Sequence, residues 1–443
     1  MTARASAAPV DRPWANWARN QRAVASSVVT PSSIAEVSEL VVRAAAEGRR
    51  VKPIGAGHSF SAIAVPVDVQ VDLENLRGLL AVDTATGTAT FAAGTRLREI
   101  PALLAPHGLA MENLGDIDEQ SIAGAISTGT HGSGSGFGAL ATQVVALTLV
   151  TGDGELLTAD RRTDPELLHA VAVGLGALGI VVEVTLQCVP AFVLLAREQN
   201  EPLATLIPAL HERSLQSDHL DIYWFPHTER ALVKTNTRLP GHSTVRPPSD
   251  ARRWFDDEFL GNTVYGALCR LGALAPQLVP TMNRLTSSAV AQREYSDRSH
   301  RVFVARRTVR FVEQEYALPA ENLAEALERV RDVIDRRGFR ISFPLEIRFS
   351  AGDDIWMSPA NGRATGYLAV HRYFREPYAE YFAAVEEVCV ALGGRPHWGK
   401  YHTLTAEVLQ PSYPRFEEFA ALRDRLDPQR IFSNPYLEQV LGS

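Results

Sequence analysis

One short loop, at residues 53–60, constrains the possible folds most strongly. It reads Pro-Ile-Gly-Ala-Gly-His-Ser-Phe and follows an apolar segment that is typical of a strand. Its two glycines allow positive φ angles and leave backbone amides uncovered. Amides that converge in this way bind anionic oxygens. The histidine, His58, suits a base, a ligand or a covalent tether. Taken alone, the loop is equally compatible with an ordinary strand-to-loop turn.

A second run of small residues lies at residues 112–138. Five glycines fall within its last ten residues, among hydroxyl side chains. Such a run offers many hydrogen-bond donors to a diphosphate and no bulk to exclude it. Residues 134–139 match Gly-x-Gly-x-x-Ala, but a strand-like segment follows where a Rossmann motif requires a helix. A flexible glycine linker is the alternative, and the apolar strands on both sides argue against it.

Six stretches, in the same order along the chain, resemble one family. They read Gly-Ala-Gly-His-Ser-Phe at 55–60, Asn-Leu-Gly-Asp at 113–116, Ser-Ile-Ala-Gly at 121–124, Thr-Gly-Thr-His-Gly-Ser-Gly at 128–134, Glu-Ile-Arg at 346–348 and His-Trp-Gly-Lys at 397–400. Together they resemble the vanillyl-alcohol-oxidase type of FAD-binding fold, in its branch of aldonolactone oxidoreductases and alditol oxidases. The resemblance implies an α+β fold in which an FAD-binding domain is covered by an α+β substrate (cap) domain.

The resemblance also implies FAD as the cofactor, with a covalent bond from the His58 imidazole to the flavin. Some relatives hold FAD without that bond, so the bond is a separate hypothesis. We expect His131 to be structural or near the flavin rather than catalytic, and we expect no metal site. The residues expected to bind FAD are Ile54, Gly55, Ala56, Gly57, His58, Ser59, Gly115, Asp116, Ser121, Gly124, Thr128, Thr130, His131, Gly132, Gly179 and Ile180.

Length and composition bound the class of protein. A chain of 443 residues is too long for one ordinary core, so two domains are expected. A net charge of −7 argues against non-specific binding to nucleic acid or to an anionic membrane. The three cysteines show no disulfide or zinc spacing. Because no signal peptide or membrane span is recognisable, we expect a cytoplasmic protein, and we expect a monomer.

The order of elements predicts an α+β fold rather than a regular βαβ repeat. We expect an FAD-binding domain at 1–188, a substrate domain at 189–395, and a C-terminal segment at 396–443 that returns to the first domain. Two tryptophans near the N-terminus are expected to pin it to the body. Helices are predicted at 30–48, 97–107, 167–171, 323–334 and 416–426, strands at 51–54, 67–73, 88–93, 144–150, 155–158, 180–187, 223–226 and 302–312, and a loop at 238–256.

An alternating segment at residues 343–350 supplies candidates for catalysis. Flavin oxidation of an alcohol needs a hydride acceptor, a path for the hydroxyl proton, and a positive group where negative charge reaches the flavin. Because polar and apolar residues alternate here, Glu346 and Arg348 share one side of a strand and the other side is core. The pattern alone is equally compatible with a surface salt bridge. The resemblance favours a catalytic pair.

Two later segments add further candidates. His371 and Tyr373 share a face of a second alternating segment, and they are assigned with His397 to the substrate. The His-x-Tyr pattern is similar to that of the lactone enzymes, whereas alditol-oxidising relatives tend to have a small hydroxyl residue in the place of Tyr373. Lys400 is assigned as the third catalytic residue, at the substrate oxygens or the flavin pyrimidine edge.

The leading function is an FAD-dependent oxidoreductase that moves a hydride from a CH–OH group of an aldono-1,4-lactone to flavin N5. The resemblance implies that Gly115 faces the flavin and leaves room for oxygen, which would give hydrogen peroxide, although another electron acceptor stays open. Three alternatives remain. They are an alditol oxidase acting on xylitol or sorbitol, a tailoring oxidase of a larger glycosylated or nucleoside substrate, and a nucleotide-binding module without turnover.

Overall fold

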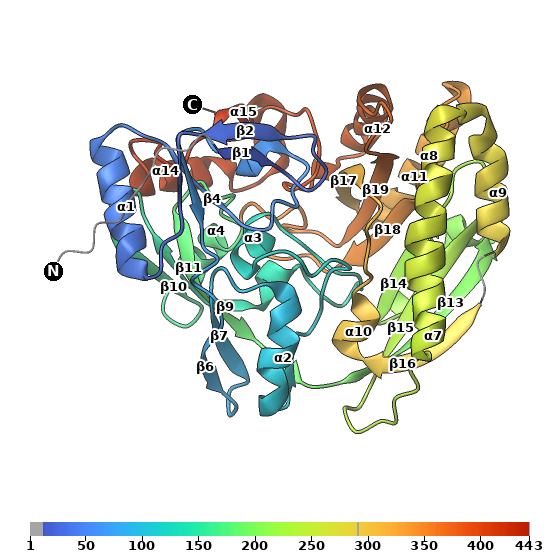
Figure 1. The fold of residues 1–443 in the computed structure, drawn as a ribbon, viewed down its shortest axis with the longest axis horizontal. Coiled ribbons are helices and arrows are strands. Elements are labelled where there is room, and N and C mark those ends of the chain that lie inside the picture. Colours follow the sequence, from blue (N-terminus) through green and yellow to red (C-terminus); the bar gives the residue numbers. More distant parts are fainter. Residues whose placement is uncertain (1–11, 290–291, 443) are drawn as a thin grey trace.

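The strands of the computed structural model, which describes residues 12–289 and 292–442, fall into two groups that lie side by side (Figure 1). The N-terminal group forms several small sheets, and the second group forms one large sheet. The fold is α+β, as predicted. The first group comprises β1 (Arg12–Ala15), β2 (Arg22–Ala25), β3 (Ser27–Val29), β4 (Val51–Ile54), β5 (Val69–Asp72), β6 (Leu79–Asp83), β7 (Thr88–Ala92), β8 (Leu109–Ala110), β9 (Val144–Val150), β10 (Leu156–Asp160), β11 (Ile180–Gln187) and β12 (Val189–Pro190).

Two sheets form the framework of the first part. Strands β3, β5 and β4 are parallel, and helix α1 (Ile34–Ala46) connects β3 to β4, because parallel pairing requires a crossover. The other sheet is antiparallel, in the order β10-β9-β11-β7-β6. Buried and half-buried side chains alternate along β11, so one face of this sheet is core. The predicted hairpin of β9 and β10 is confirmed.

One antiparallel sheet of eight strands, in the order β16-β13-β15-β14-β18-β19-β17-β20, forms the second part. Helices α11 (Leu323–Arg336) and α12 (Ala379–Ala391) pack against β19 and β17 on one face. The opposite face carries Glu313 and Glu315 and meets the first part. The strands are β13 (Val193–Pro202), β14 (His219–Trp224), β15 (Arg230–Leu239), β16 (Arg293–Arg298), β17 (Phe311–Pro319), β18 (Leu345–Ser350), β19 (Thr365–Tyr373) and β20 (Arg395–Pro396).

Helices cover the outside of both parts (Figure 1). Among the described residues, no helix is long and apolar enough to cross a bilayer. The remaining helices are α2 (Ile100–Leu104), α3 (Ile122–Ser127), α4 (Pro165–Val171), α5 (Leu203–Leu206), α6 (Leu210–Gln216), α7 (Asp250–Arg253), α8 (Tyr265–Leu274), α9 (Val279–Ala289), α10 (Ser299–Phe303), α13 (Ala406–Leu409), α14 (Phe416–Leu426) and α15 (Pro435–Leu441), and a π-helix spans Trp254–Val264.

The C-terminal segment returns to the first part, where α14 and α15 lie near β1, β2 and α1 (Figure 1). The Val51 N–H of β4 donates to the carbonyl oxygen of Ile431 at 2.8 Å. The buried Asn434 amide donates to three carbonyl oxygens of residues 62–65, at 3.0 to 3.2 Å. These contacts join the end of the C-terminal segment to the first part, whereas the domain limits at 188 and 395 stay a prediction.

Three predicted elements need correction. The helix predicted from residue 30 begins only at Ile34, because the Ser33 hydroxyl accepts the Glu36 N–H and caps it. The loop predicted at 238–256 ends at residue 249, where α7 begins. The strand predicted at 302–312 is wrong.

Its first residues, Val302 and Phe303, end helix α10. The chain that follows is held by the Ala305 N–H, which donates to the Asp116 carbonyl oxygen at 3.0 Å. The Thr308 N–H donates to Asn262 Oδ1 at 2.7 Å. Strand β17 therefore begins only at Phe311.

The second half of the glycine-rich run packs between the two parts. The Gly134 N–H donates to the Phe349 carbonyl oxygen at 2.8 Å, and the ring of Phe137 stacks on His219. Gly134 has a φ of +125°, and a Cβ there would lie 2.2 Å from the Asp218 carbonyl oxygen. A close approach of two backbones therefore requires this glycine. The predicted diphosphate role is not supported for this half of the run.

The contacts of Asn434 give the first prediction. Replacing Asn434 by alanine leaves buried carbonyl oxygens unpaired and removes the cap of α15, whose Leu437 N–H donates to Asn434 Oδ1. We expect Asn434→Ala to lower the free energy of unfolding by about 2–4 kcal/mol in denaturant titrations. The control is Asn75→Ala, because the Asn75 amide makes one exposed contact of 3.4 Å. Equal stability of the two variants would contradict the anchoring role.

Candidate active site

A first cavity runs beneath the loop that follows β4. About 910 Å3 of it is free of protein atoms, and part of this space is open to solvent. The loop, the N-terminal residues of α3 and the segment before β11 form its walls. The predicted FAD-binding residues that line it are Ile54, Gly55, Ala56, Gly57, His58, Ser59, Ser121, Gly124, Thr128 and Gly179.

The local geometry of this loop explains its residues. A Cβ on Gly55 would lie 2.5 Å from Ser121 Oγ, so only glycine lets the loop approach α3 so closely. Gly57 has a φ of +67°, which favours glycine, and its carbonyl oxygen accepts the Trp17 N–H at 2.7 Å. None of the described residues accepts a hydrogen bond from the backbone N–H groups of residues 56–59. These groups are free to bind a ligand with anionic oxygens.

Two cations at the first cavity were missed by sequence reasoning. Lys52 is buried, and its Nζ donates to the carbonyl oxygens of Phe432 at 3.0 Å and Gly176 at 3.4 Å. Arg96 also lines the cavity, and its buried Nη1 has no hydrogen-bond partner among the described residues. A signal was present for Lys52, because the chain has only three lysines. Both cations suit a ligand with negative charge.

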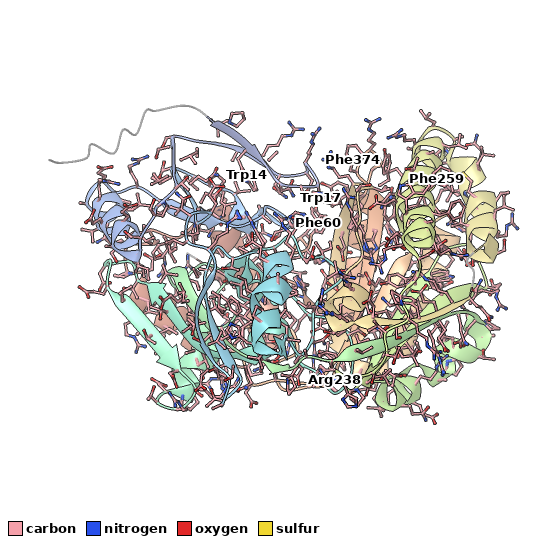
Figure 2. All side chains as sticks on the ribbon, turned by 60° about the horizontal axis from the view of Figure 1, so that its bottom comes forward. Trp14, Trp17, Phe60, Arg238, Phe259 and Phe374 are labelled. Carbon is pink, nitrogen blue, oxygen red and sulfur yellow. The ribbon has the colours of Figure 1, made fainter. Side chains whose placement is uncertain are left out.

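A second cavity lies between the first part and the face of the eight-stranded sheet. It has about 600 Å3 of free space. Residues 58 and 59 line both cavities, as do Gln120 and Thr128, so the two are continuous. Trp17 forms one wall, its ring stacking on His58 at 5.7 Å between centroids and meeting Phe60 at 6.3 Å. Figure 2 shows Trp17 and Phe60 close together between the two parts, so the expected pinning by this tryptophan is confirmed.

His58 lies where the two cavities meet. Its Nδ1 contacts the carbonyl oxygen of Ala56 at 3.1 Å. A carbonyl oxygen only accepts, so Nδ1 carries the proton and Nε2 keeps a lone pair. Burial lowers the pKa of His58, and nearby cations, Arg96 foremost, lower it further, although the hydrogen bond to Ala56 acts in the opposite direction. A neutral imidazole with a free lone pair is the form required for nucleophilic attack.

Arg348 is the centre of a buried ionic cluster at the second cavity. Its Nη2 lies 2.5 Å from Glu346 Oε1 and 3.4 Å from Asp116 Oδ1, and its Nε donates to Asp221 Oδ1 at 2.9 Å. Residues 346 and 348 share one side of β18, as predicted, and their burial rules out the surface salt bridge. The contact with Glu346 is ionic and lacks hydrogen-bond geometry, so Glu346 Oε1 has no hydrogen-bond donor.

The pKa values of two carboxyl groups in this cluster are shifted in opposite directions. Burial raises the pKa of Glu346, and the Arg348 guanidinium offsets only part of that effect. Burial also opposes ionisation of Asp116, but Arg307 and Arg348 outweigh it and lower its pKa. Asp116 is therefore the permanent counter-charge, and Glu346 is the group able to exchange a proton. Arg307 was also missed by sequence reasoning, because it lies inside the segment at 302–312 that was wrongly predicted as a strand.

Lys400 and His397 form another wall of the second cavity. Burial lowers the pKa of Lys400, but Glu313 and Glu315 outweigh it, so the pKa is raised and the ammonium is retained. The imidazole of His397 accepts the Gly399 N–H at Nδ1, at 3.0 Å. Its pKa is lowered to about 3, mainly by burial, so this ring is neutral.

Not all predicted residues are brought together. Gly115, Asp116, Thr130, His131, Arg348, His397 and Lys400 line the second cavity, whereas Gly132, Ile180, Glu346, His371 and Tyr373 line neither cavity. Glu346 lies behind Arg348, and His371 lies behind Glu313. Tyr373 is buried against Phe374. A Cβ on Gly132 would lie 2.4 Å from the Leu114 carbonyl oxygen, so that glycine serves backbone packing.

Comparison with known proteins identifies the family. The family model of D-arabinono-1,4-lactone oxidase matches residues 184–440, and that of the FAD-binding domain matches residues 25–160. The chain belongs to the D-arabinono-1,4-lactone oxidase family. It is 42% identical to the L-gulono-1,4-lactone dehydrogenase of Mycobacterium tuberculosis, over 97% of this chain and 99% of that protein. It is 34% identical to the L-gulonolactone oxidase of Bos taurus, over 96% and 97%.

Solved structures agree on the fold of this D-arabinono-1,4-lactone oxidase family member. Cholesterol oxidase from B. sterolicum superimposes with a TM-score of 0.78 at 18% identity, over 98% of this chain and 97% of that one. The fold is thus of the predicted FAD-binding type, and the protein is an FAD-dependent oxidoreductase. The first cavity fits this cofactor, because the free N–H groups of residues 56–59 and the unpaired Arg96 Nη1 suit a diphosphate.

The buried Lys52 gives a prediction of pH dependence. Its pKa is lowered to about 7 by burial first and then by Arg423, whereas the unfolded chain has the ordinary value near 10.5. Between pH 7 and 10.5 the unfolded state therefore binds more protons, and stability rises with pH. We expect the wild type to gain stability relative to Lys52→Met over this window, by up to about 1.4 kcal/mol per pH unit. If the free energy of unfolding changed with pH equally in the two proteins, this prediction would be contradicted.

Proposed function

We propose that the protein oxidises an aldono-1,4-lactone, such as L-gulono- or D-arabinono-1,4-lactone, at the hydroxyl-bearing carbon beside the lactone carbonyl. The observation that carries the proposal is the buried Glu346–Arg348 pair beside Lys400, at a cavity continuous with the one that suits FAD. A small polar substrate is favoured because cations and neutral imidazole line the second cavity. The names of the two relatives point to the same class of substrate.

Different side chains have different roles in the proposed oxidation of the alcohol. FAD, when bound, supplies the acceptor for the hydride that leaves the substrate carbon. Glu346 lines neither cavity, so it receives the hydroxyl proton through one bridging water beside Arg348, and burial raises the pKa of its carboxyl group. Arg348 and Lys400 bind the substrate oxygens and face the negative charge that develops nearby. Asp116 and Asp221 hold the guanidinium in place.

Replacing Glu346 tests its proposed role as the proton acceptor. We expect Glu346→Gln to keep FAD binding and to slow anaerobic flavin reduction by the best lactone by about 10²- to 10⁴-fold, because the proton acceptor is lost. Stopped-flow absorbance of the flavin measures the rate. The matched control is Glu198→Gln, which removes a buried carboxylate paired with Arg293 elsewhere in the same sheet. Flavin reduction at the wild-type rate in Glu346→Gln would overturn the role and revive a binding module without turnover.

A substrate panel separates the remaining alternatives. Reduction of the flavin by xylitol or sorbitol and not by lactones would establish an alditol oxidase. Reduction only by larger glycosides or nucleosides would establish a tailoring oxidase. Because Tyr373 lies outside both cavities, the preference for lactones rests on the relatives and not on this residue.

We further propose that the His58 imidazole tethers the flavin covalently. The neutral ring, its free Nε2 and its place between the cavities support this bond. Flavin fluorescence of the protein band on a denaturing gel measures the tether, and His58→Ala is expected to abolish the fluorescence while holding FAD non-covalently. A wild-type band without fluorescence would exclude the tether.

Gly115 gives a prediction about the electron acceptor. We propose that oxygen reoxidises the flavin and yields hydrogen peroxide, because Gly115 leaves its side of the second cavity open. A Cβ there would lie 3.2 Å from the His131 carbonyl oxygen and would narrow the cavity. We expect Gly115→Ala to slow reoxidation by oxygen at least about tenfold while changing reduction by lactone less than about twofold. Gly136→Ala is the control, because a Cβ at Gly136 meets nothing within 4 Å. An unchanged rate of reoxidation by oxygen in Gly115→Ala would reject this role of Gly115.

A cytoplasmic location and a monomeric state complete the proposal. The three free, buried cysteines support a reducing compartment. Sedimentation of the purified protein tests the monomeric state, and a concentration-dependent dimer would reject it.

A further inference from the structure

Two buried carboxylates on β17 are not explained by the roles assigned so far. Glu313 and Glu315 are two residues apart on one strand, so both side chains point to the same face of the sheet. Each is only 4% exposed. Two adjacent anions in a protein interior are costly unless cations compensate them. Their partners should therefore show what the pair does.

The first partner is Lys400. Its Nζ lies 2.5 Å from Glu313 Oε2 and 3.9 Å from Glu315 Oε2. The backbone fixes this position, because the His397 N–H donates to the Glu315 carbonyl oxygen and the Tyr401 N–H to that of Glu313. The turn that carries Lys400 is thus bonded to β17 at both of its ends. The ammonium lies at the second cavity, 5.3 Å from the centre of the Phe60 ring.

The second partners are two histidines. His371 Nε2 lies 3.4 Å from Glu313 Oε1, and His131 Nε2 lies 3.2 Å from Glu315 Oε1. The Nδ1 atom of each ring contacts a backbone carbonyl oxygen, that of Pro344 at 2.9 Å and that of Gly132 at 2.8 Å. A carbonyl oxygen only accepts, so both Nδ1 atoms carry protons.

This arrangement fixes the charge of each histidine–glutamate pair. With Nδ1 protonated, the contact between Nε2 and the carboxyl group needs one further proton, on either the ring or the carboxyl group. In both cases the pair is neutral as a whole. Burial raises the pKa of Glu313, but Lys400 and then His371 outweigh it and bring the pKa to about 2. His131 also stacks on Tyr367 at 3.5 Å between centroids, which fixes the orientation of its ring.

We propose that Glu313 and Glu315 are positioning residues that fix the Lys400 ammonium at the second cavity. His131 and His371 balance their charge, so Lys400 supplies the net positive charge of this five-residue cluster. A cation in that place stabilises negative charge that develops on the reacting groups. The same satisfied contacts, with an ammonium among them, oppose a metal ion, although His131, Glu315 and His397 lie close enough to hold one. The catalytic consequence rests on the proposed function, whereas the anchoring does not.

The anchoring is measurable without FAD, because the chain has only three lysines. Protein labelled with 13C at lysine Cε gives three signals, and Lys400→Arg identifies the one from Lys400. We expect its titration midpoint to lie above the ordinary value of about 10.4, since Glu313 and Glu315 hold the proton while Asp116 adds to their effect. In Glu313→Gln the midpoint should fall by about one pH unit or more, and by less in Glu315→Gln. Glu198→Gln is the control and should leave the signal unchanged.

A wild-type midpoint at or below about 10.4, or an unchanged midpoint in Glu313→Gln, would overturn the proposal. The holoenzyme gives a second test through additivity. If Glu313 acts through Lys400, Glu313→Gln slows flavin reduction at least about tenfold in the wild type but less than about twofold in a Lys400→Met background. Equal effects in both backgrounds would reject the positioning role. A wild type that no lactone reduces would instead reject the proposed function, and the lysine titration would still decide the anchoring.

Discussion

The Arg348 guanidinium is the contact on which the junction between the two parts depends. It lies in the interior and faces carboxylates from three separate elements, namely Glu346 of β18, Asp221 of β14 and Asp116 of the first part. Removing any one carboxylate would leave a buried charge without a full set of partners, which costs several kcal/mol. The same guanidinium lines the second cavity. Closing the sheet onto the first part and assembling the site are therefore one event.

Arginine and lysine occupy positions that need different kinds of contact. The planar guanidinium of Arg348 reaches three carboxylates at once, which a compact ammonium cannot do. Only three of the 44 basic residues are lysines, and each donates to an acceptor inside the protein. Two of them, Lys52 and Lys400, line the two cavities. Lysine is thus kept for places where one point charge or a shifted pKa is useful.

Sequence reasoning succeeded where local pattern and geometry coincide. The loop after β4 and the alternation of Glu346 with Arg348 could be read directly, because a strand places every second side chain on one side. The same reasoning missed Glu313 and Glu315, because the strand was placed at 302–312 and so ended before them. It also assigned the whole glycine-rich run to diphosphate binding. Gly134 is instead required because the backbone of Asp218, in the second part, approaches too closely for a side chain. No local pattern reveals such a partner.

The sequence by itself determined the α+β class, the two glycine loops, the FAD-dependent chemistry and the shared side of Glu346 and Arg348. Each of these depends on neighbours along the chain or on motif order. Only the tertiary structure decided that Trp17 stacks on His58, that Lys400 lies between two carboxylates of β17, and that Tyr373 stays in the core. The reason is physical. Burial and charge pairing join residues that are far apart in the sequence, and they set which groups keep a charge once water is excluded.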